Sequence, residues 1–356
     1  MPTPSSNPTP KTVFVVGAGA SQEANMPIGS ELKKSIARVL NIKFKFGGQM
    51  ISGDHRIVEA LRAAAEGSDP PSRDINPFLH AGWRICDAMP QASSIDAFID
   101  SHRGDKQIEL CGKLAIVRTI LEAEAKSHLF VEFLGDHQLK FDRLENTWFN
   151  SFFRLLTEAC QSSDLATRLK SVTLVIFNYD RCIEHFLYYA FQNYYGMSAS
   201  DVAQLLQHLE IFHPYGTVGS LPWLNQNHTI AYGATTNSNQ LLKLASQIKT
   251  YTESTNESLS DVNAIRSHMK TSDKLVFLGF AFHRWNMELL LPSATVETPH
   301  MGRRVFGTAY DISDSDTNSI RTELTKGVSF VNHLQIRNDL TCSQLFREYW
   351  RDLSFV

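Results

Sequence analysis

The chain has 356 residues and a formal net charge of −3, with 43% hydrophobic and 20% charged residues. This composition is that of a globular protein, and the charge gives no basic field of the kind that attracts nucleic acids. No apolar run approaches the roughly 20 residues that a membrane span needs. The five cysteines are far apart and form no C-x-x-C pair, which argues against a zinc ribbon or a disulfide framework and favours a reducing cytoplasm.

The first ten residues, "MPTPSSNPTP", have neither a basic start nor an apolar centre. They therefore predict a short flexible tail and not a secretory signal. Residues 11–356 contain no internal repeat and no linker rich in proline or glycine. We expect them to form a single domain.

A strand followed by a glycine-rich turn is expected at the start of this domain. The apolar residues 13–16 predict a buried strand, and a helix signal follows at Ser30. This succession is typical of turns that hold a phosphate, although Glu23 stands where a dinucleotide-binding fingerprint has its third glycine. A turn that only allows the helix to pack is the alternative. The candidate phosphate-binding residues are Gly17, Ala18, Gly19, Ala20 and Ser21.

Five further short apolar runs have the character of buried parallel strands. Helical patterns separate them, so the sequence predicts an α/β fold: a Rossmann-like, doubly wound, mostly parallel sheet. The runs are residues 172–177, 210–212, 274–278, 304–306 and 329–331.

Residues 50–165, between the first two strands, predict a large helical insertion. Apolar residues recur at helical spacing over 107–129 and 145–160, and Ser93 or Ser94 is expected to cap another helix. We expect the insertion to pack on the sheet as a lid or a partner surface. Asp96 and Asp100 are interpreted as solvated helix residues, and a C-terminal helix is expected at about 341–354.

Polar or glycine-rich motifs follow three of the predicted strands, namely "NYD" at 178–180, "HPYG" at 213–216 and "GFAFH" at 279–283. Because ligands of open α/β sheets bind beyond the carboxyl ends of the strands, these motifs are expected to share one site with the glycine turn. Other interpretations remain open. Asn178 and Asp180 could cap the helix that begins near Arg181. His213 could be a buried structural histidine, and His283 competes with it for a catalytic role.

Taken together, the ordered set GAGAS, N-Y-D, H-x-Y-G-x-x-G and L-G-F resembles the sirtuin-like domains of bacterial anti-phage defence proteins. The segments "SIDAFIDSH", "GKLAIV", "YGTVGSLPW" and "FLGFAFHRWNMELL" are also similar to that family, so the resemblance extends from about Lys11 to Asp311. It implies a Rossmann-like core that cleaves NAD+ to nicotinamide and ADP-ribose and so depletes an infected cell of NAD+. The family's catalytic asparagine and histidine correspond to Asn178 and His213.

The resemblance implies NAD+ as substrate, no further cofactor and no metal. Asp180 is a third candidate catalytic residue, and the candidate NAD+ contacts outside the glycine turn are Gly216, Gly279, Phe280 and His283. The chain departs from the family where Phe177 replaces a threonine and where Pro214 and Tyr215 separate the histidine from its glycine. It lacks the two C-x-x-C pairs of sirtuin deacetylases, so water is the expected acceptor.

The residue types fit this chemistry, because an oxocarbenium-like transition state needs positioning and proton transfer more than a strong nucleophile. The Asn178 amide would hold the ribose or the attacking water, and a neutral His213 would accept a proton. The alternatives are an NAD+ or ADP-ribose sensor without turnover, a dehydrogenase and a scaffold without nucleotide. The family also implies control by homo-oligomerisation or by a separately encoded defence protein, such as a HerA-type ATPase or another nucleotide-handling protein.

Overall fold

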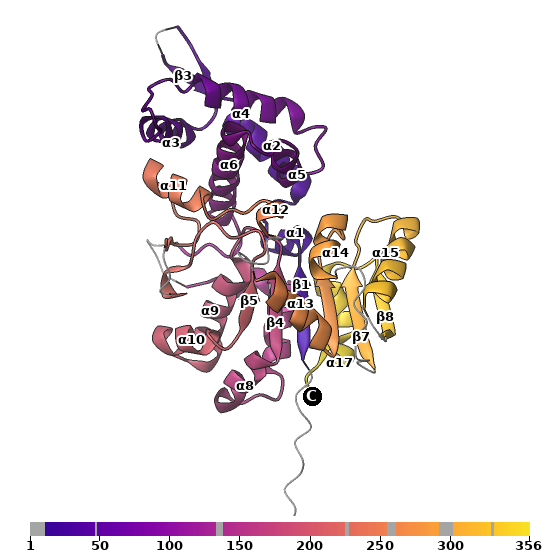
Figure 1. Cartoon of the computed structure of the whole chain (residues 1–356). Coiled ribbons are helices and arrows are strands. Elements are labelled where there is room, and N and C mark those ends of the chain that lie inside the picture. The colour runs from indigo at the N-terminus through magenta and orange to yellow at the C-terminus, as the bar shows by residue number, and fades with distance from the viewer. Residues whose placement is uncertain are drawn as a thin grey trace, which may run out of the picture.

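A computed structural model describes residues 11–46, 48–132, 138–224, 228–254, 261–291, 302–328 and 331–356. Its centre is a six-stranded, wholly parallel sheet in the order β5-β4-β1-β6-β7-β8 (Figure 1). Counted along the chain, this is the order third-second-first-fourth-fifth-sixth, which is that of the Rossmann fold. The predicted α/β class and doubly wound sheet are confirmed. The strands are β1 (Thr12–Val16), β4 (Val172–Ile176), β5 (Glu210–Phe212), β6 (Lys274–Leu278), β7 (Arg303–Thr308) and β8 (Val331–Arg337).

The central strands were recognisable in the sequence because helices cover both faces of the sheet, so every residue of β1, β4 and β6 is buried. Val13 pairs with Thr173 on one side and with Leu275 on the other. The last strand begins at Val331 and continues to Arg337, beyond the predicted run at 329–331, of which residues 329 and 330 lie outside the described part. The expected tail at 1–10 also lies outside it.

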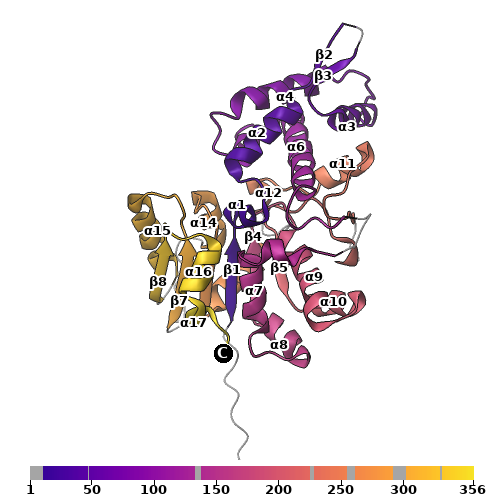
Figure 2. The same cartoon turned by 180° about the vertical axis from the view of Figure 1, so that it is seen from behind.

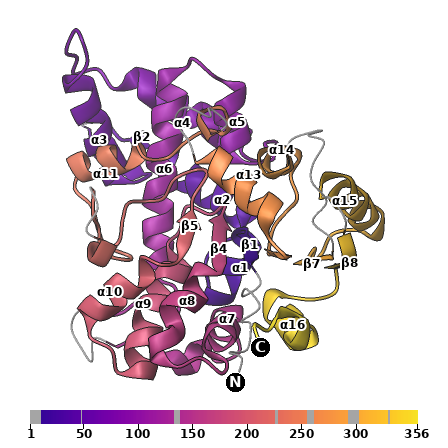
Figure 3. The same cartoon turned by 60° about the horizontal axis from the view of Figure 1, so that its bottom comes forward.

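Helices form a layer on each face of the sheet. α7 (Trp148–Thr157) and α16 (Cys342–Glu348) pack together on one face (Figure 2), and α13 (Val262–Thr271) and α14 (Arg284–Leu290) lie on the other. Figure 3 shows the two layers on either side of the strands. The remaining helices around the sheet are α8 (Leu165–Lys170), α9 (Cys182–Tyr195), α10 (Ala199–Leu206), α15 (Asp314–Gly327) and α17 (Trp350–Leu353). The single C-terminal helix predicted at 341–354 is thus two helices, α16 and α17, which meet at Tyr349.

A helical lobe stands over the carboxyl ends of the strands (Figure 1). It contains α2 (Gly29–Leu40), α3 (His55–Glu66), α4 (Asn76–Ala88), α5 (Ile95–Ser101), α6 (Lys106–Glu124), α11 (Ser238–Ala245) and α12 (Tyr251–Ser254). A short antiparallel hairpin of β2 (Lys43–Phe44) and β3 (Met50–Ser52), which was not predicted, extends from it. α11 packs against α3 and α6 although it follows β5 in the sequence.

The helices therefore divide differently from the predicted insertion at 50–165. The lobe begins earlier, with α2, and it includes a segment that follows β5. α7 and α8 belong to the layers around the sheet, where Phe152 of α7 packs edge-on against Phe14 of β1 with ring centroids 4.9 Å apart. α6 ends at Glu124, earlier than the predicted helix over 107–129.

Candidate functional site

The glycine turn is joined backbone to backbone with the end of β6. The Gly17 amide donates to the Leu278 carbonyl at 2.9 Å, and the Gly19 amide donates to the Gly279 carbonyl at 3.0 Å. Gly279 has a φ of +55°, and a Cβ on it would overlap the Ala20 amide nitrogen. A Cβ on Gly17 would lie 2.6 Å from the Gly279 carbonyl oxygen. These glycines are therefore required by the close approach of two strand ends.

This packing changes the expected role of the turn. Residues Ala18–Ser21 form a single helical turn, α1, and the amides of Gly17, Gly19 and Ala20 already donate to backbone carbonyls. Ala18 is exposed, and its amide has no acceptor among the described residues. A phosphate at this turn would thus meet the Ala18 amide first, and the alternative interpretation, a turn that allows a helix to pack, accounts for the two glycines.

Glu23 has a structural role that explains why it replaces a third glycine. Its carboxylate accepts hydrogen bonds from the Trp148 amide at 2.6 Å and from the Ser343 amide at 2.9 Å. These two residues lie in the first turns of α7 and α16. Burial raises the pKa of Glu23, while these hydrogen bonds oppose the rise. The Trp148 indole also donates to the Ala20 carbonyl at 2.8 Å. The glycine turn is therefore connected directly to both helices of one layer.

Asn178 follows β4 and lies beside this turn. Its side-chain amide donates to the Gly17 carbonyl at 3.1 Å and to the Ser21 hydroxyl at 2.9 Å, and only 6% of the residue is exposed. The alternative of a helix cap does not apply to Asn178, because its side chain points to the turn after β1 and not to α9. The predicted proximity of the N-Y-D motif to the glycine turn is therefore confirmed for Asn178 and Ser21.

Asp180 combines the two interpretations. Its carboxylate accepts a hydrogen bond at 3.2 Å from the amide of Cys182, the first residue of α9, although Arg181 occupies the N-cap position. The Ser21 hydroxyl, which accepts a hydrogen bond from Asn178, is close enough to lower the pKa of the Asp180 carboxyl. Burial raises the pKa of Asp180, and these hydrogen bonds only partly offset the rise.

His213 follows β5 and has an acceptor at each ring nitrogen. Nδ1 lies 3.3 Å from the Asn178 carbonyl oxygen, and Nε2 lies 2.6 Å from Glu184 Oε1. Burial lowers the pKa of His213, but the Glu184 carboxylate and the Asn178 carbonyl outweigh burial, so the pKa is raised above 6.5. The expected neutral His213 is therefore corrected: this arrangement favours the imidazolium.

Glu184 was not singled out in the sequence. It lies in the first turn of α9, and its second carboxylate oxygen is buried without a hydrogen-bond partner among the described residues. An acidic residue four positions after Asp180 falls on the same side of the chain once a helix begins there. That spacing, together with a histidine after the next strand, is the signal that would have identified it.

The other predicted contacts have structural roles in this arrangement. Gly216 has a φ of +75° in a turn whose amide donates to the His213 carbonyl at 2.9 Å. Phe280 is buried among aromatic rings, with its centroid 5.1 Å from that of Phe177. His283 is exposed at the beginning of α14, and its side chain forms no hydrogen bond within the described part of the chain.

The lobe contacts the site through α5. The Tyr179 hydroxyl, within the N-Y-D motif, donates to the Asp96 carboxylate. Burial raises the pKa of Asp96, and the Tyr179 hydrogen bond opposes the rise. Asp96 is therefore not simply solvated, as was expected, because it is half-buried and accepts from Tyr179; Asp100 is also half-buried and lies 3.1 Å from Arg103. Ser94 caps α5, as one of the two predicted alternatives, by accepting from the Ala97 amide at 3.0 Å.

No protein-family model and no curated protein sequence matches this chain. Within the described ranges, no group of three or more His, Cys, Asp and Glu residues is arranged to hold a metal ion, and no helix is long and apolar enough to cross a membrane. The assignment of the site therefore depends on the geometry of the cluster itself, which we define as Ser21, Asn178, Asp180, Glu184 and His213.

Proposed function

We propose that this protein hydrolyses NAD+ to nicotinamide and ADP-ribose. The observation that carries the proposal is the cluster of Ser21, Asn178, Asp180, Glu184 and His213 at the carboxyl ends of β1, β4 and β5. In a Rossmann sheet, the nucleotide crevice lies at this edge, where the strand order reverses beside the first strand. An amide can position water or ribose hydroxyls, a carboxylate can stabilise developing positive charge, and a histidine–carboxylate pair can accept a proton in the cleavage of an N-glycosidic bond.

In the proposed reaction, the bond between C1′ of the ribose and the nicotinamide nitrogen breaks, and nicotinamide leaves with the electron pair. Water adds to C1′ and releases one proton. Positive charge develops on the ribose in the transition state, so nearby carboxylates stabilise it and a positioned amide orients the water or the ribose hydroxyls. Asn178 is assigned the positioning role, and Asp180 the electrostatic one.

The proton acceptor in this proposal is the His213–Glu184 pair. Because both ring nitrogens of His213 face acceptors, the imidazole must lose the proton shared with Glu184 before it can accept another. The unpartnered Glu184 oxygen offers a place for hydrogen bonding when the pair reorganises. Activity is then expected to increase as the pH rises through the raised pKa of His213.

Binding of NAD+ or ADP-ribose without turnover is the second candidate function. Two features of His213 favour it: Nδ1 faces the Asn178 carbonyl and Nε2 faces the Glu184 carboxylate, so neither ring nitrogen is free to accept a proton from water. A cluster in this state would bind a nucleotide and await reorganisation. The same features would keep a hydrolase silent until a partner acts.

As a hydrolase, the protein would serve as an NAD+-depleting effector of anti-phage defence in the cytoplasm, as its resemblance to sirtuin-like domains implies. Free NAD+ hydrolysis is toxic, so control by a homo-oligomer or by a separately encoded defence protein is part of the proposal. Turnover should then increase with protein concentration or on addition of proteins encoded beside it. If the dilute monomer is fully active and no such protein changes its rate, the proposed control by association is wrong.

The test is to incubate the full chain with NAD+ and to separate the products by chromatography. Free nicotinamide, lost in Asn178→Ala and retained in Asn332→Ala, is the expected result, since Asn332 is an exposed asparagine of β8 away from the cluster. NAD+ binding without nicotinamide release would favour the sensor. A reduced cofactor would indicate a dehydrogenase, and neither binding nor turnover would leave a scaffold.

A further inference from the structure

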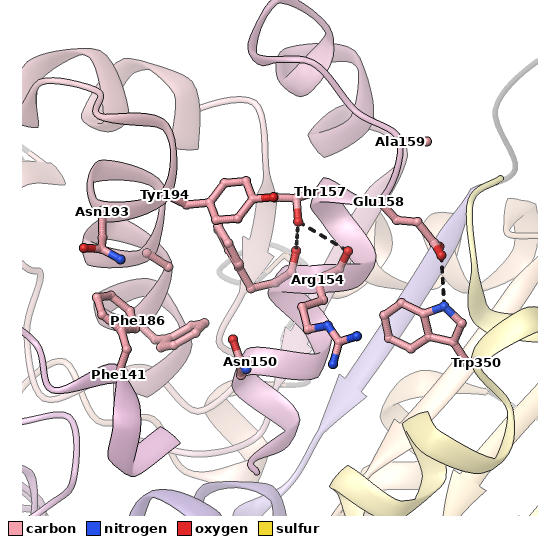
Figure 4. Close-up of a pocket in the computed structure, with 12 residues that line it drawn as sticks. Phe141, Asn150, Arg154, Thr157, Glu158, Ala159, Phe186, Asn193, Tyr194 and Trp350 are labelled. Carbon is pink, nitrogen blue, oxygen red and sulfur yellow. Dashed lines mark hydrogen bonds between the residues drawn. The ribbon is translucent and has the colours of Figure 1, made fainter. Parts of the chain in front are cut away.

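Two neighbouring cavities lie on the outer side of α7, and no residue of the proposed catalytic cluster lines them. The larger, of about 570 Å³, lies between α7, α9 and α17, and the smaller, of about 330 Å³, lies between α7, α16 and α17. They share Asn150, Arg154 and Trp350 (Figure 4). We call the two together the α7 groove. Its size is that of a small-molecule site, for which about 300–1,000 Å³ is usual.

The larger half of the α7 groove is aromatic. Its rings are those of Phe141, Phe153, Phe186, Tyr194 and Trp350. Tyr194 is 64% exposed, and its ring packs edge-on against Phe153 with centroids 5.4 Å apart. Figure 4 shows Tyr194 and Phe186 facing α7 across the cavity. Tyr194 is the exposed ring of this half, Phe141 and Trp350 are half-buried, and Phe153 and Phe186 are buried. A flat, unsaturated ligand would therefore stack on Tyr194.

The smaller half presents two guanidinium groups. Arg154 stacks over the Trp350 ring at 5.4 Å, and no carboxylate pairs with it among the described residues. Arg347 donates to the neutral Asn146 side chain at 3.2 Å. Glu145 is the acidic residue of this half and Glu158 that of the larger half, so the groove as a whole carries two positive and two negative side chains.

The Glu158 carboxylate lines the larger half of the groove and forms no ion pair with Arg154 among the described residues. One oxygen accepts from the Trp350 indole at 3.0 Å, and the other accepts from the Ser354 hydroxyl at 2.7 Å. Arg154 is thus held in place by stacking, with its hydrogen-bond donors directed to solvent. A planar guanidinium in this state is suited to a phosphate or carboxylate.

The α7 groove is mechanically connected to the glycine turn. Arg154 lies on α7 and Arg347 on α16, and Glu23 binds the first turn of both helices. Trp148, at the start of α7, also holds the Ala20 carbonyl. A ligand that draws α7 and α16 together would therefore act on the turn beside Asn178.

We propose that the α7 groove is a second ligand site, which binds a nucleoside phosphate with its base against the aromatic half and its phosphate between Arg154 and Arg347, and which controls the catalytic cluster through α7 and α16. The control clause rests on the proposed function; the binding clause does not. A nucleoside phosphate is favoured over an acidic peptide because an aromatic and an arginine-bearing half adjoin within one half-open groove of small-molecule size.

The binding test uses the full chain carrying Asn178→Ala, with 5′-AMP, adenosine and an acidic peptide as probes in titration calorimetry. Arg154→Gln and Trp350→Leu should each weaken AMP binding about tenfold or more, and adenosine should bind correspondingly worse than AMP. Arg351→Gln is the matched control, because Arg351 is an exposed arginine of α17 that lines neither cavity. Unfolding midpoints identify any variant that has lost its fold, and Arg154→Lys provides a milder change at the same position.

AMP affinity that is the same in Arg154→Gln and in the parent would overturn the proposal. So would an acidic peptide that binds through Arg154 when AMP does not. The control clause is tested by NAD+ turnover of the chain with its natural Asn178, where AMP should change the rate in the parent and not in Arg154→Gln. If AMP binds but leaves the rate of NAD+ cleavage unchanged, the control clause is wrong and the binding site stands. If no condition releases nicotinamide, the proposed function is wrong. In that case the calorimetry still decides whether the α7 groove binds AMP.

Discussion

The protonation of His213 decides what the catalytic cluster can do. A histidine with acceptors at both nitrogens is stabilised as the imidazolium, and Glu184 at 2.6 Å supplies the opposite charge. Such a histidine resists acting as a base near neutral pH unless its partner moves. The sequence predicted the position of His213, but its protonation depends on Glu184, which belongs to another element.

We expect His213→Ala to lower NAD+ cleavage by about 10²–10⁴, the usual loss for a proton-transfer group. His283→Ala should cost less, because His283 is exposed at the beginning of α14 and forms no hydrogen bond with the catalytic cluster in the described part of the chain. Initial rates of nicotinamide release, with equal unfolding midpoints as the folding control, measure both. If His283→Ala loses activity while His213→Ala keeps it, the two roles must be exchanged.

A second prediction concerns Glu184→Gln. Because the Glu184 carboxylate raises the pKa of His213, removing its charge should lower that pKa and move the acid limb of the rate–pH profile to lower pH. The histidine ring signals in NMR should titrate in the same direction without any substrate. Glu210→Gln is the matched control, since Glu210 pairs with His268 at 3.0 Å outside the cluster and should leave the profile in place. If the acid limb of the rate–pH profile does not move in Glu184→Gln, the His213–Glu184 pair is not the proton acceptor of the reaction.

At the scale of elements, the joint between α1 and the end of β6 positions the whole site. The joint exists because Gly17, Gly19 and Gly279 have no Cβ, which lets two backbones meet. A Cβ on Gly19 would lie 3.0 Å from the Gly279 Cα, so we expect Gly19→Val to be destabilised as well as to weaken nucleotide binding.

Gly279→Ala tests the joint directly. Gly196→Ala is its control, because Gly196 has a similar φ of +64°, against +55° for Gly279, but nothing lies within 4 Å of a Cβ there. Both variants should lose about 1–2 kcal/mol from the left-handed backbone. Gly279→Ala should lose about 1–3 kcal/mol more from overlap with the Ala20 amide. Urea unfolding measures the difference between the two variants. Equal losses of unfolding free energy would show that the glycine turn can shift to accommodate a Cβ on Gly279.

Across the whole molecule, features that depend on local sequence patterns could be predicted, and features that depend on contacts between distant parts of the chain could not. The strands of the sheet could be predicted because burial on both faces leaves short apolar runs in the sequence. The membership of the lobe could not, because α11 joins α3 and α6 from beyond β5. Glu23 and Glu184 were missed for the same reason: their partners, Ser343 and His213, are remote in sequence.

The lobe and the sheet are fastened by a buried ion pair between Glu124 of α6 and Arg181, directly before α9. The two side chains meet through two hydrogen bonds of 3.0 and 2.5 Å, and both are almost fully buried. Arg181 also donates to the Ile230 carbonyl at 2.7 Å, so the pair organises the segment after His213 as well. Since Arg181 follows Asp180 in the chain, the ion pair also restrains the backbone next to the catalytic cluster.

Glu124→Gln should therefore lower the free energy of unfolding by about 3–5 kcal/mol, because it leaves the Arg181 charge buried without an opposite charge. Glu122→Gln, on the same helix, is the control. Glu122 pairs with Lys126 at 2.6 Å and Arg38 at 2.9 Å near the surface, where ion pairs contribute about 0–1 kcal/mol. The double variant Glu124→Leu with Arg181→Met removes both charges and should recover part of the loss. Recovery should be incomplete, since the Gly219 and Ile230 carbonyls then lose their donor. Urea unfolding followed by circular dichroism measures all three variants. A Glu124→Gln variant no less stable than Glu122→Gln would mean that the lobe is held by its apolar contacts alone.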